Sequence, residues 1–240
     1  DGGRAVVDQP GGDELRAMIR DGEGRFLAVG RTTVAGDPLS TVVRLLANGE
    51  SDSTFGTDGI KTDSFTPSDE IVTGVAVEDS GRILLSVRVS RSEGYIVRLD
   101  SDGAADSTFG TGGVAKLEGM DGTTAGAEDV FFRGGDVAAI GGHHEMGPGN
   151  GDFGLWRTST DGMSFVSYPA NLAPNVSVWD GALGPGGRLA ITGWVTQASL
   201  IQEGGIALFD LDEQAFVSGV GSSGTLRFNA GDGTSFFRSA

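Results

Sequence analysis

The chain has 240 residues, of which 42 are glycine and 7 are proline, and 38% are hydrophobic. This composition indicates short buried strands joined by many tight turns, and no apolar run of about 18 residues predicts membrane insertion. The formal net charge of −16 argues against nucleic acid and anionic membranes as partners. The lack of cysteine excludes disulfides, thiolate metal sites and a cysteine nucleophile.

The first residues read as the end of a repeat unit. Residues 1–12 begin with Asp-Gly-Gly and continue into a short apolar stretch, as does the strand that closes each of the next two units. Neither a Met nor an apolar signal region stands at Asp1. The sequence therefore predicts a processed mature form or a fragment, with an end strand that belongs to a preceding unit.

The first full unit is predicted over residues 13–62. Turn residues that tolerate positive φ divide it, at 21–24 and at Asn48-Gly49, and the second of these suits a type I′ turn. Strands are expected at 15–20, 25–33, 41–46 and 59–62.

The second unit, residues 63–117, repeats features of the first. Val-Arg-Leu at 43–45 recurs at 97–99, and Asp-Ser-Thr-Phe-Gly at 52–56 recurs at 106–110, each 54 positions later (97 − 43 and 106 − 52). Apolar residues at 83, 85, 87 and 89 alternate with residues of the other face, which is the period of a β-strand. A fixed period of this length indicates a repeat architecture.

Two further units are predicted over residues 118–170 and 171–229, which keep the turn positions but lack the Asp-Ser-Thr-Phe-Gly motif. Residues 230–240 read as the first strand of a following unit. Four hairpin-linked strands in each unit of about 50–55 residues predict an all-β fold, a β-propeller of four-stranded antiparallel blades with partial blades at both ends. A solenoid or a pair of immunoglobulin-like sandwiches explains the period less well.

Because both ends of the sequence fall within a repeat, we expect a larger ring. The remainder of a cleaved precursor or another chain would complete it. The single domain of residues 1–240 is therefore predicted to be one propeller or part of one.

The repeated segments resemble a known family. Val-Arg-Leu, an Asn-Gly or Asp-Gly turn, Asp-Ser-Thr-Phe-Gly and a closing Gly are similar to the delta-60 repeat over residues 41–62 and 95–116. The resemblance implies a propeller and a large secreted or surface protein of a bacterium. It implies no common activity and no catalytic motif.

The repeated motif also has a purely structural interpretation. Asp52 and Asp106 are expected to accept backbone hydrogen bonds in the loops that follow them. Phe55 and Phe109 are expected to fill the space between adjacent blades, each followed by a glycine whose backbone angle other residues rarely reach.

Two clusters offer metal-binding chemistry. Asp100, Asp102 and Asp106 lie within seven residues, and oxygen-rich loops of this kind hold calcium, although the EF-hand pattern is absent. The alternative interpretation of these residues is a turn without metal.

The second cluster consists of His143, His144, Glu145 and Asp152, which a Gly-rich segment brings within reach of one another if it forms a loop. Two histidines without a third are few ligands for zinc or copper, so an exposed loop is the alternative interpretation.

For function, the sequence favours a non-enzymatic interaction or scaffold module of an exported or surface bacterial protein, binding a protein or polysaccharide. One alternative is an extracellular polysaccharide hydrolase or lyase that uses carboxylates in the propeller channel, although the sequence does not select which pair. The other alternative is a calcium-stabilised adhesin. No other cofactor is predicted.

Overall fold

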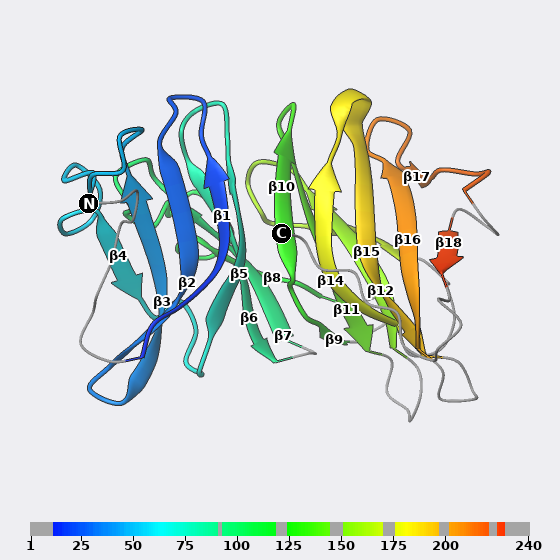
Figure 1. Ribbon diagram of the computed structural model, residues 1–240, viewed down its shortest axis with the longest axis horizontal. Helices are drawn as coiled ribbons and strands as arrows, with labels where there is room; N and C mark the ends of the chain where they lie inside the picture. The colour runs from blue at the N-terminus through cyan, green and yellow to red at the C-terminus, as the bar shows by residue number, and fades with distance from the viewer. Residues whose placement is uncertain are drawn as a thin grey trace.

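The protein is an all-β propeller arc of four blades, as a computed structural model shows (Figure 1). The blades follow one another across the molecule in chain order. The structure describes residues 12–90, 93–118, 124–144, 151–169, 176–196, 202–220 and 225–228. The partial blades predicted for residues 1–12 and 230–240 lie outside these ranges, apart from Gly12.

Each blade is an antiparallel meander, in which each strand pairs with the next one along the chain. Blade 1 contains β1 (Glu14–Arg20), β2 (Phe26–Val34), β3 (Asp37–Leu45) and β4 (Ile60–Asp63). Blade 2 contains β5 (Ile71–Val77), β6 (Ile83–Ser90), β7 (Glu93–Leu99) and β8 (Val114–Lys116). Blade 3 contains β10 (Asp129–Arg133), β11 (Asp136–His144), β12 (Gly151–Thr158) and β13 (Phe165–Pro169).

Blade 4 differs at its outer edge. It contains β14 (Val176–Leu183), η2 (Pro185–Gly187), β15 (Arg188–Thr196) and β16 (Gln202–Asp210). Two short strands, β17 (Ala215–Phe216) and β18 (Thr225–Phe228), take the position of the fourth strand, and both pair with β16. A short strand, β9 (Thr124–Ala125), pairs with both β7 and β11 and so links the sheets of blades 2 and 3.

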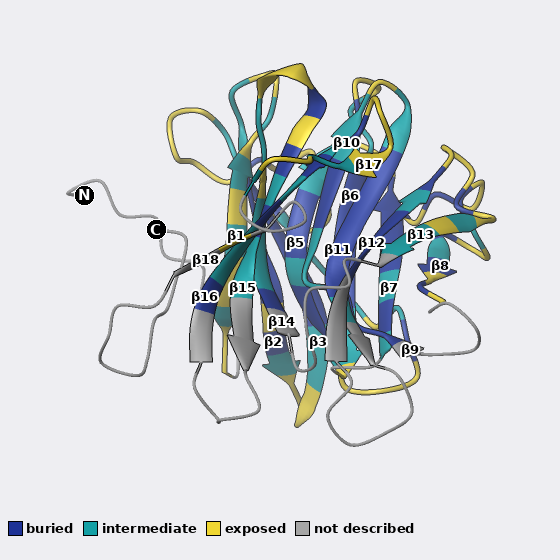
Figure 2. Cartoon of the chain, turned by 90° about the vertical axis from the view of Figure 1, so that its right-hand side faces the viewer, coloured by how far each residue is buried: buried dark blue, intermediate teal, exposed yellow. Residues whose placement is uncertain are grey.

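The core is divided among the three interfaces between consecutive blades. One cluster of buried apolar residues lies between blades 1 and 2, a second between blades 2 and 3, and a third between blades 3 and 4. Strand β6 contributes to two of these clusters, because Leu85 packs toward blade 1 and Leu84 packs toward blade 3. The strands of the inner blades are accordingly buried while the loops at the blade ends are exposed (Figure 2).

The turn between β3 and β4 differs from the type I′ turn expected at Asn48-Gly49. Gly49 and its counterpart Gly103 adopt positive φ (+85° and +93°), but Asn48 and Asp102 do not. The Gly49 amide donates to the Leu46 carbonyl at 2.8 Å, which closes a type I turn. A three-residue loop with a left-handed glycine in its last position takes this form, whereas type I′ serves two-residue loops.

The first strands of the blades are irregular. In β1, β5 and β14 one extra residue bulges out of the pairing with the next strand: Arg16, Thr73 and Trp179. A bulge redirects the side chains next to it, which affects the surface these strands share. Within the described ranges the protein forms no helix of the length and hydrophobicity that a membrane span requires.

Candidate functional site

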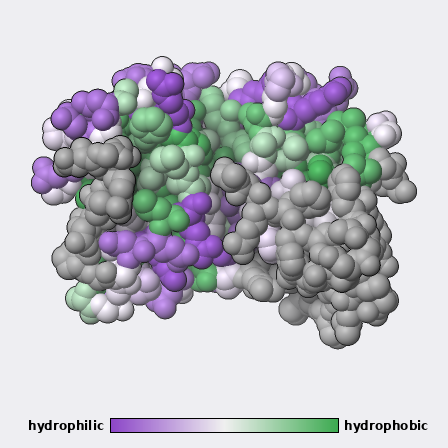
Figure 3. Space-filling model, viewed as in Figure 1, coloured by the Kyte–Doolittle hydropathy of each residue, from purple (hydrophilic) through white to green (hydrophobic). Residues whose placement is uncertain are grey.

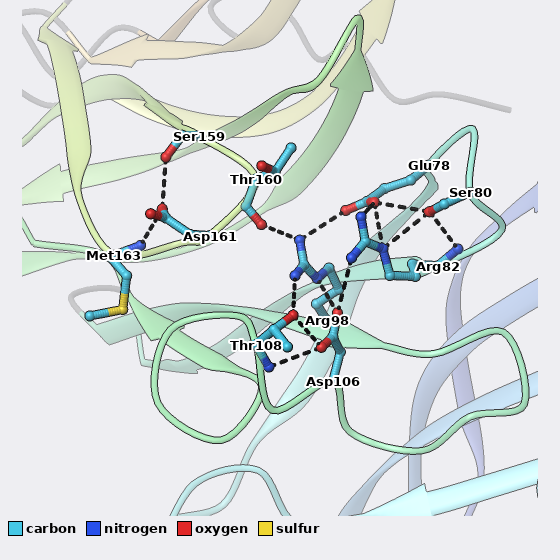
Figure 4. Close-up of polar contacts among 10 residues, drawn as sticks. All are labelled: Glu78, Ser80, Arg82, Arg98, Asp106, Thr108, Ser159, Thr160, Asp161 and Met163. Atoms are coloured by element: carbon cyan, nitrogen blue, oxygen red, sulfur yellow. Dashed lines mark hydrogen bonds and ion pairs between the residues drawn. The ribbon is translucent and has the colours of Figure 1, made fainter.

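The repeated motif forms a buried ion-pair cluster in blade 2. Arg98 donates from Nε to Asp106 Oδ2 at 2.8 Å and from Nη2 to Thr108 Oγ1 at 3.0 Å (Figure 4). Glu78 lies 3.4 Å from Arg98 Nη1 and also pairs with Arg82. Burial alone would raise the pKa of Asp106, but hydrogen bonds from Thr108 and the charge of Arg98 outweigh it and lower the pKa to about 2.

The same motif joins each blade to the next. The Phe109 ring is fully buried, lies 4.7 Å from the Arg98 guanidinium and packs against Gly162 of blade 3. The Gly110 amide donates to the Asp161 carbonyl at 2.7 Å, and Arg98 donates to the Thr160 carbonyl. Blade 1 repeats these contacts on blade 2.

In blade 1 the corresponding residues are Arg44, Asp52 and Phe55. Arg44 donates to Asp52 at 2.8 Å, the Thr54 amide donates to Asp52 Oδ1 at 3.0 Å, and the Phe55 ring is fully buried. The predicted roles of the aspartates and phenylalanines are confirmed. We call residues 52–56 and 106–110 the plug motifs. Their aspartates and phenylalanines are buried and hold consecutive blades together.

The three aspartates that the sequence suggested as calcium ligands differ in their surroundings. Asp106 is buried against Arg98, whereas Asp100 and Asp102 are exposed and the Asp102 carboxylate accepts the Ala104 amide at 3.1 Å. In the part of the chain that the structure describes, no three His, Cys, Asp or Glu residues are grouped so that they could hold a metal ion. The calcium site stays a prediction.

The histidine cluster does not lie in a loop as expected. His143 and His144 belong to β11, and their backbones pair with Asp152 and Gly151 of β12. Glu145 lies outside the described residues. Strand β11 therefore extends further along the sequence than expected.

The larger candidate site is a groove that the sequence did not identify. The first strands of the four blades, β1, β5, β10 and β14, line a cavity of about 950 Å³, here called the central groove. On blade 1 it presents Leu15 and Met18, whose exposed fractions are 54% and 64%. Figure 3 shows hydrophobic residues gathered on this face of the molecule below a hydrophilic upper rim.

The opposite wall of the central groove is acidic. Glu128, Asp129 and Asp180 come from blades 3 and 4. Glu128 is paired with Arg88 at 2.5 Å, and Asp180 accepts the amide of Gly181 at 2.8 Å. The third carboxylate, Asp129, lies against Gly74 of blade 2.

Asp129 occupies a place that a glycine leaves open. A Cβ built on Gly74 of β5 would lie 2.1 Å from Asp129 Oδ1, so only glycine fits there. Burial, together with the charges of Asp180 and Glu128, raises the pKa of Asp129 to about 8, against the lowering effect of the Val130 amide. Asp129 is therefore largely protonated at neutral pH.

Sequence reasoning missed this acidic wall, although the repeat frame holds a signal. Gly74, Asp129 and Asp180 take corresponding positions in the first strands of blades 2, 3 and 4, each directly after the bulge or strand start. Aligning the first strands unit by unit would have placed two aspartates on one surface. It would not have shown their burial.

Replacing Asp129 with asparagine is expected to remove a pH dependence of stability. With a pKa near 3.8 in the unfolded chain and about 8 when folded, Asp129 keeps a proton in the folded protein that the unfolded chain has released. Its stabilising contribution is full below about pH 4, declines as the pH rises and is lost above about pH 8. Asparagine stays neutral, so D129N should exceed the parent in stability by up to about 5 kcal/mol at pH 8 and match it near pH 4.

Urea unfolding of both proteins at several pH values measures this difference. The exposed Asp102→Asn is the matched control, because it makes the same chemical change without burial. A D129N protein that is less stable than the parent at pH 8 would contradict a protonated Asp129.

The comparisons with known proteins agree with this architecture. A family model described as "Domain of unknown function (DUF5122) beta-propeller" matches residues 24–55 and 80–109. Each matched segment runs from the end of the first hairpin turn to the phenylalanine of a plug motif. A comparison with curated proteins finds no significant match.

Two solved structures show the same fold. An endo-1,4-β-xylanase of Bacteroides thetaiotaomicron is similar with 10% identity and a TM-score of 0.52, over 86% of this chain and 76% of that one. A bifunctional GH43-CE protein of Bacteroides eggerthii is similar with 15% identity and a TM-score of 0.50, over 86% of this chain and 25% of that one. The protein is therefore a β-propeller built from a propeller-type repeat.

Proposed function

We propose that the protein is a non-enzymatic binding module whose ligand lies in the central groove. The observation that carries the proposal is the pairing of two unlike walls in one groove, with exposed Leu15 and Met18 on blade 1 and a carboxylate wall on blades 3 and 4. Such a groove suits an extended protein segment that carries both apolar and cationic side chains.

The charge state of the acidic wall gives this ligand a pH signature. A cationic group beside Asp129 favours its ionised form, so binding releases the proton that the folded protein holds. Affinity for a cationic segment is therefore expected to rise as the pH approaches about 8.

Titration of the full chain with a hexapeptide of alternating lysine and leucine tests the proposal. We expect Met18→Ser and Asp180→Asn each to weaken binding by about 3–10-fold, because each removes one contact of the groove. Calorimetry in buffers of different ionisation enthalpy measures both the affinity and the proton released.

The control variant is Met163→Ser, which makes the same change at an exposed methionine (69%) outside the groove. Equal affinity of the parent and both groove variants for the peptide would contradict the central groove as the binding site.

A glycoside hydrolase is the second candidate. The observation in its favour is that Asp129, whose raised pKa keeps it protonated, lies on the same wall of the groove as a second carboxyl group, Asp180, since glycoside hydrolysis uses a pair of carboxyl groups. The xylanase of similar fold motivates xylan as the substrate to test. Against it, Asp129 lies against Gly74 and Glu128 is held by Arg88.

Release of reducing sugar from xylan separates the two candidates. A hydrolase would release sugar, and Asp129→Asn and Asp180→Asn would lower the rate by at least about 100-fold. A binding module releases none at any protein concentration.

The source of the protein is part of the same proposal. The resemblance of residues 41–62 and 95–116 to the delta-60 repeat supports an exported or surface protein of a bacterium. In that setting the partner is a protein or a polysaccharide at the cell surface.

A further inference from the structure

Three turns of the propeller share one geometry. They occupy residues 46–50, 100–104 and 159–163, and in each the fourth residue is a glycine with positive φ (+85°, +93° and +64°). In each, the amide of that glycine donates to the carbonyl three residues earlier. The side chain before the glycine accepts an amide two residues further on, at 3.0, 3.1 and 3.0 Å. The three turns are therefore equivalent surfaces on blades 1, 2 and 3.

Two of these turns are occupied by a plug motif. Gly103 is buried under the Phe55 ring, and Gly162 is buried under the Phe109 ring. A Cβ on these glycines would approach the rings to 3.0 and 2.5 Å, so the ring needs the bare backbone. The carbonyls of the turn accept hydrogen bonds from the arginine and from the Gly amide of the motif.

The turn on blade 1 has the same form, but neither plug motif of the described residues lies on it. Residues 47–50 are exposed, and among the described residues a Cβ on Gly49 would meet nothing within 4 Å. Both plug motifs in the described part of the chain are already buried in blades 2 and 3. Within the described residues, the blade 1 turn is thus a surface of the same form that no plug motif covers.

We propose that residues 47–49 form a socket for the plug motif of a further repeat unit, supplied from outside the four described blades. The occupant carries an arginine in its third strand and Asp-Ser-Thr-Phe-Gly after it. Its phenylalanine lies on Gly49, its arginine donates to the Ala47 carbonyl, and its last glycine donates to the Asn48 carbonyl. This inference does not depend on the function proposed for the central groove.

The chemistry of the socket selects this occupant over a second copy of the chain. The socket offers two backbone carbonyls as hydrogen-bond acceptors and a glycine without a side chain. Its occupant must therefore supply two hydrogen-bond donors and an aromatic ring at a fixed spacing. A second copy has its Phe55 and Phe109 rings fully buried in its own blades and would have to unfold an interface to supply one. A separate repeat unit has a free motif.

An extended chain tests the socket. Residues 64–111, which include the plug motif of blade 2, are placed before Asp1, so that Asp1-Gly2 follow as Gly112-Gly113 do in the chain. We expect the added unit to dock on blade 1 and raise the Tm by at least about 5 °C. The NMR signals of residues 47–50 should shift on extension.

Two controls separate docking from a general effect of the extension. The same extension with alanine at the copies of Arg98 and Phe109 is expected to lose the Tm gain. Gly49→Asn in the socket should also abolish it, because asparagine tolerates a left-handed backbone yet fills the place of the ring. Its effect on the unextended chain is measured separately.

Three outcomes would overturn the proposal. The first is a Tm unchanged by the extension, and the second is a gain that survives both controls. The third is association of the unextended chain through residues 47–50 in sedimentation and NMR, which would assign this surface to a second copy instead.

Discussion

Replacing Phe109 with alanine is expected to destabilise the protein by about 3–5 kcal/mol. The ring is fully buried between blades 2 and 3, under the Arg98 guanidinium and against Gly162. Its removal leaves a cavity that neighbouring blades cannot close, because strand pairing and the Gly110–Asp161 hydrogen bond hold them in place. A loss of this size is a large fraction of the stability of a typical domain.

Urea unfolding followed by tryptophan fluorescence measures the loss, and Trp156 reports on the affected interface because it belongs to the same apolar cluster. Val166→Ala is the control, since Val166 is 58% exposed and its truncation removes much less packing. A Phe109→Ala protein within about 1 kcal/mol of the parent would show that the ring does not hold the blades together.

The plug motif could be interpreted from sequence because its chemistry is local. An aspartate two residues before a threonine caps the loop, and both Asp52 and Asp106 do so. A phenylalanine before a glycine of positive φ then turns inward, as the φ of +54° at Gly56 and +52° at Gly110 shows. The repeat of 54 residues made the plug motif recognisable, and the residue types in the motif indicated its structural role.

The segment around His143 was misread because glycine has two uses. The Gly-rich run at 147–151 suggested a loop that begins at His143, but β11 extends to His144 and already contains a glycine, Gly141. A Cβ there would come within 1.8 Å of the Gly126 carbonyl oxygen, so this glycine permits close approach of another segment. That requirement comes from tertiary packing, which the local sequence does not contain.

The acidic wall of the central groove was out of reach for a related reason. The repeat frame gives the positions of Asp129 and Asp180, but their properties depend on neighbours from other blades. Gly74 makes room for Asp129, and burial in that place sets its pKa. The protonation state of Asp129 therefore depends on residues of neighbouring blades.

The buried cluster in blade 2 gives the second large effect. Arg98→Ala alone is expected to cost about 3–5 kcal/mol, because it leaves the buried carboxylate of Asp106 without its closest charged partner and removes one of the two arginines that Glu78 faces. Asp106→Ala should cost a similar amount for the converse reason. The double variant should lose much less than the sum of the two, with a coupling of roughly 1–3 kcal/mol, since no unpaired charge of the pair remains.

Acid titration distinguishes this cluster from a packing effect. The pKa of Asp106 is lowered to about 2, so its stabilising contribution is present above about pH 4 and is lost as the pH falls toward 2. The stability difference between the parent and Asp106→Ala should therefore shrink across that window. A packing contribution alone would leave this stability difference constant.

Arg16→Ala serves as the control for Arg98→Ala, because its ion pair with Glu14 is largely exposed and should contribute less than about 1 kcal/mol. If Arg98→Ala costs no more than that control, the cluster does not stabilise the junction between blades 2 and 3.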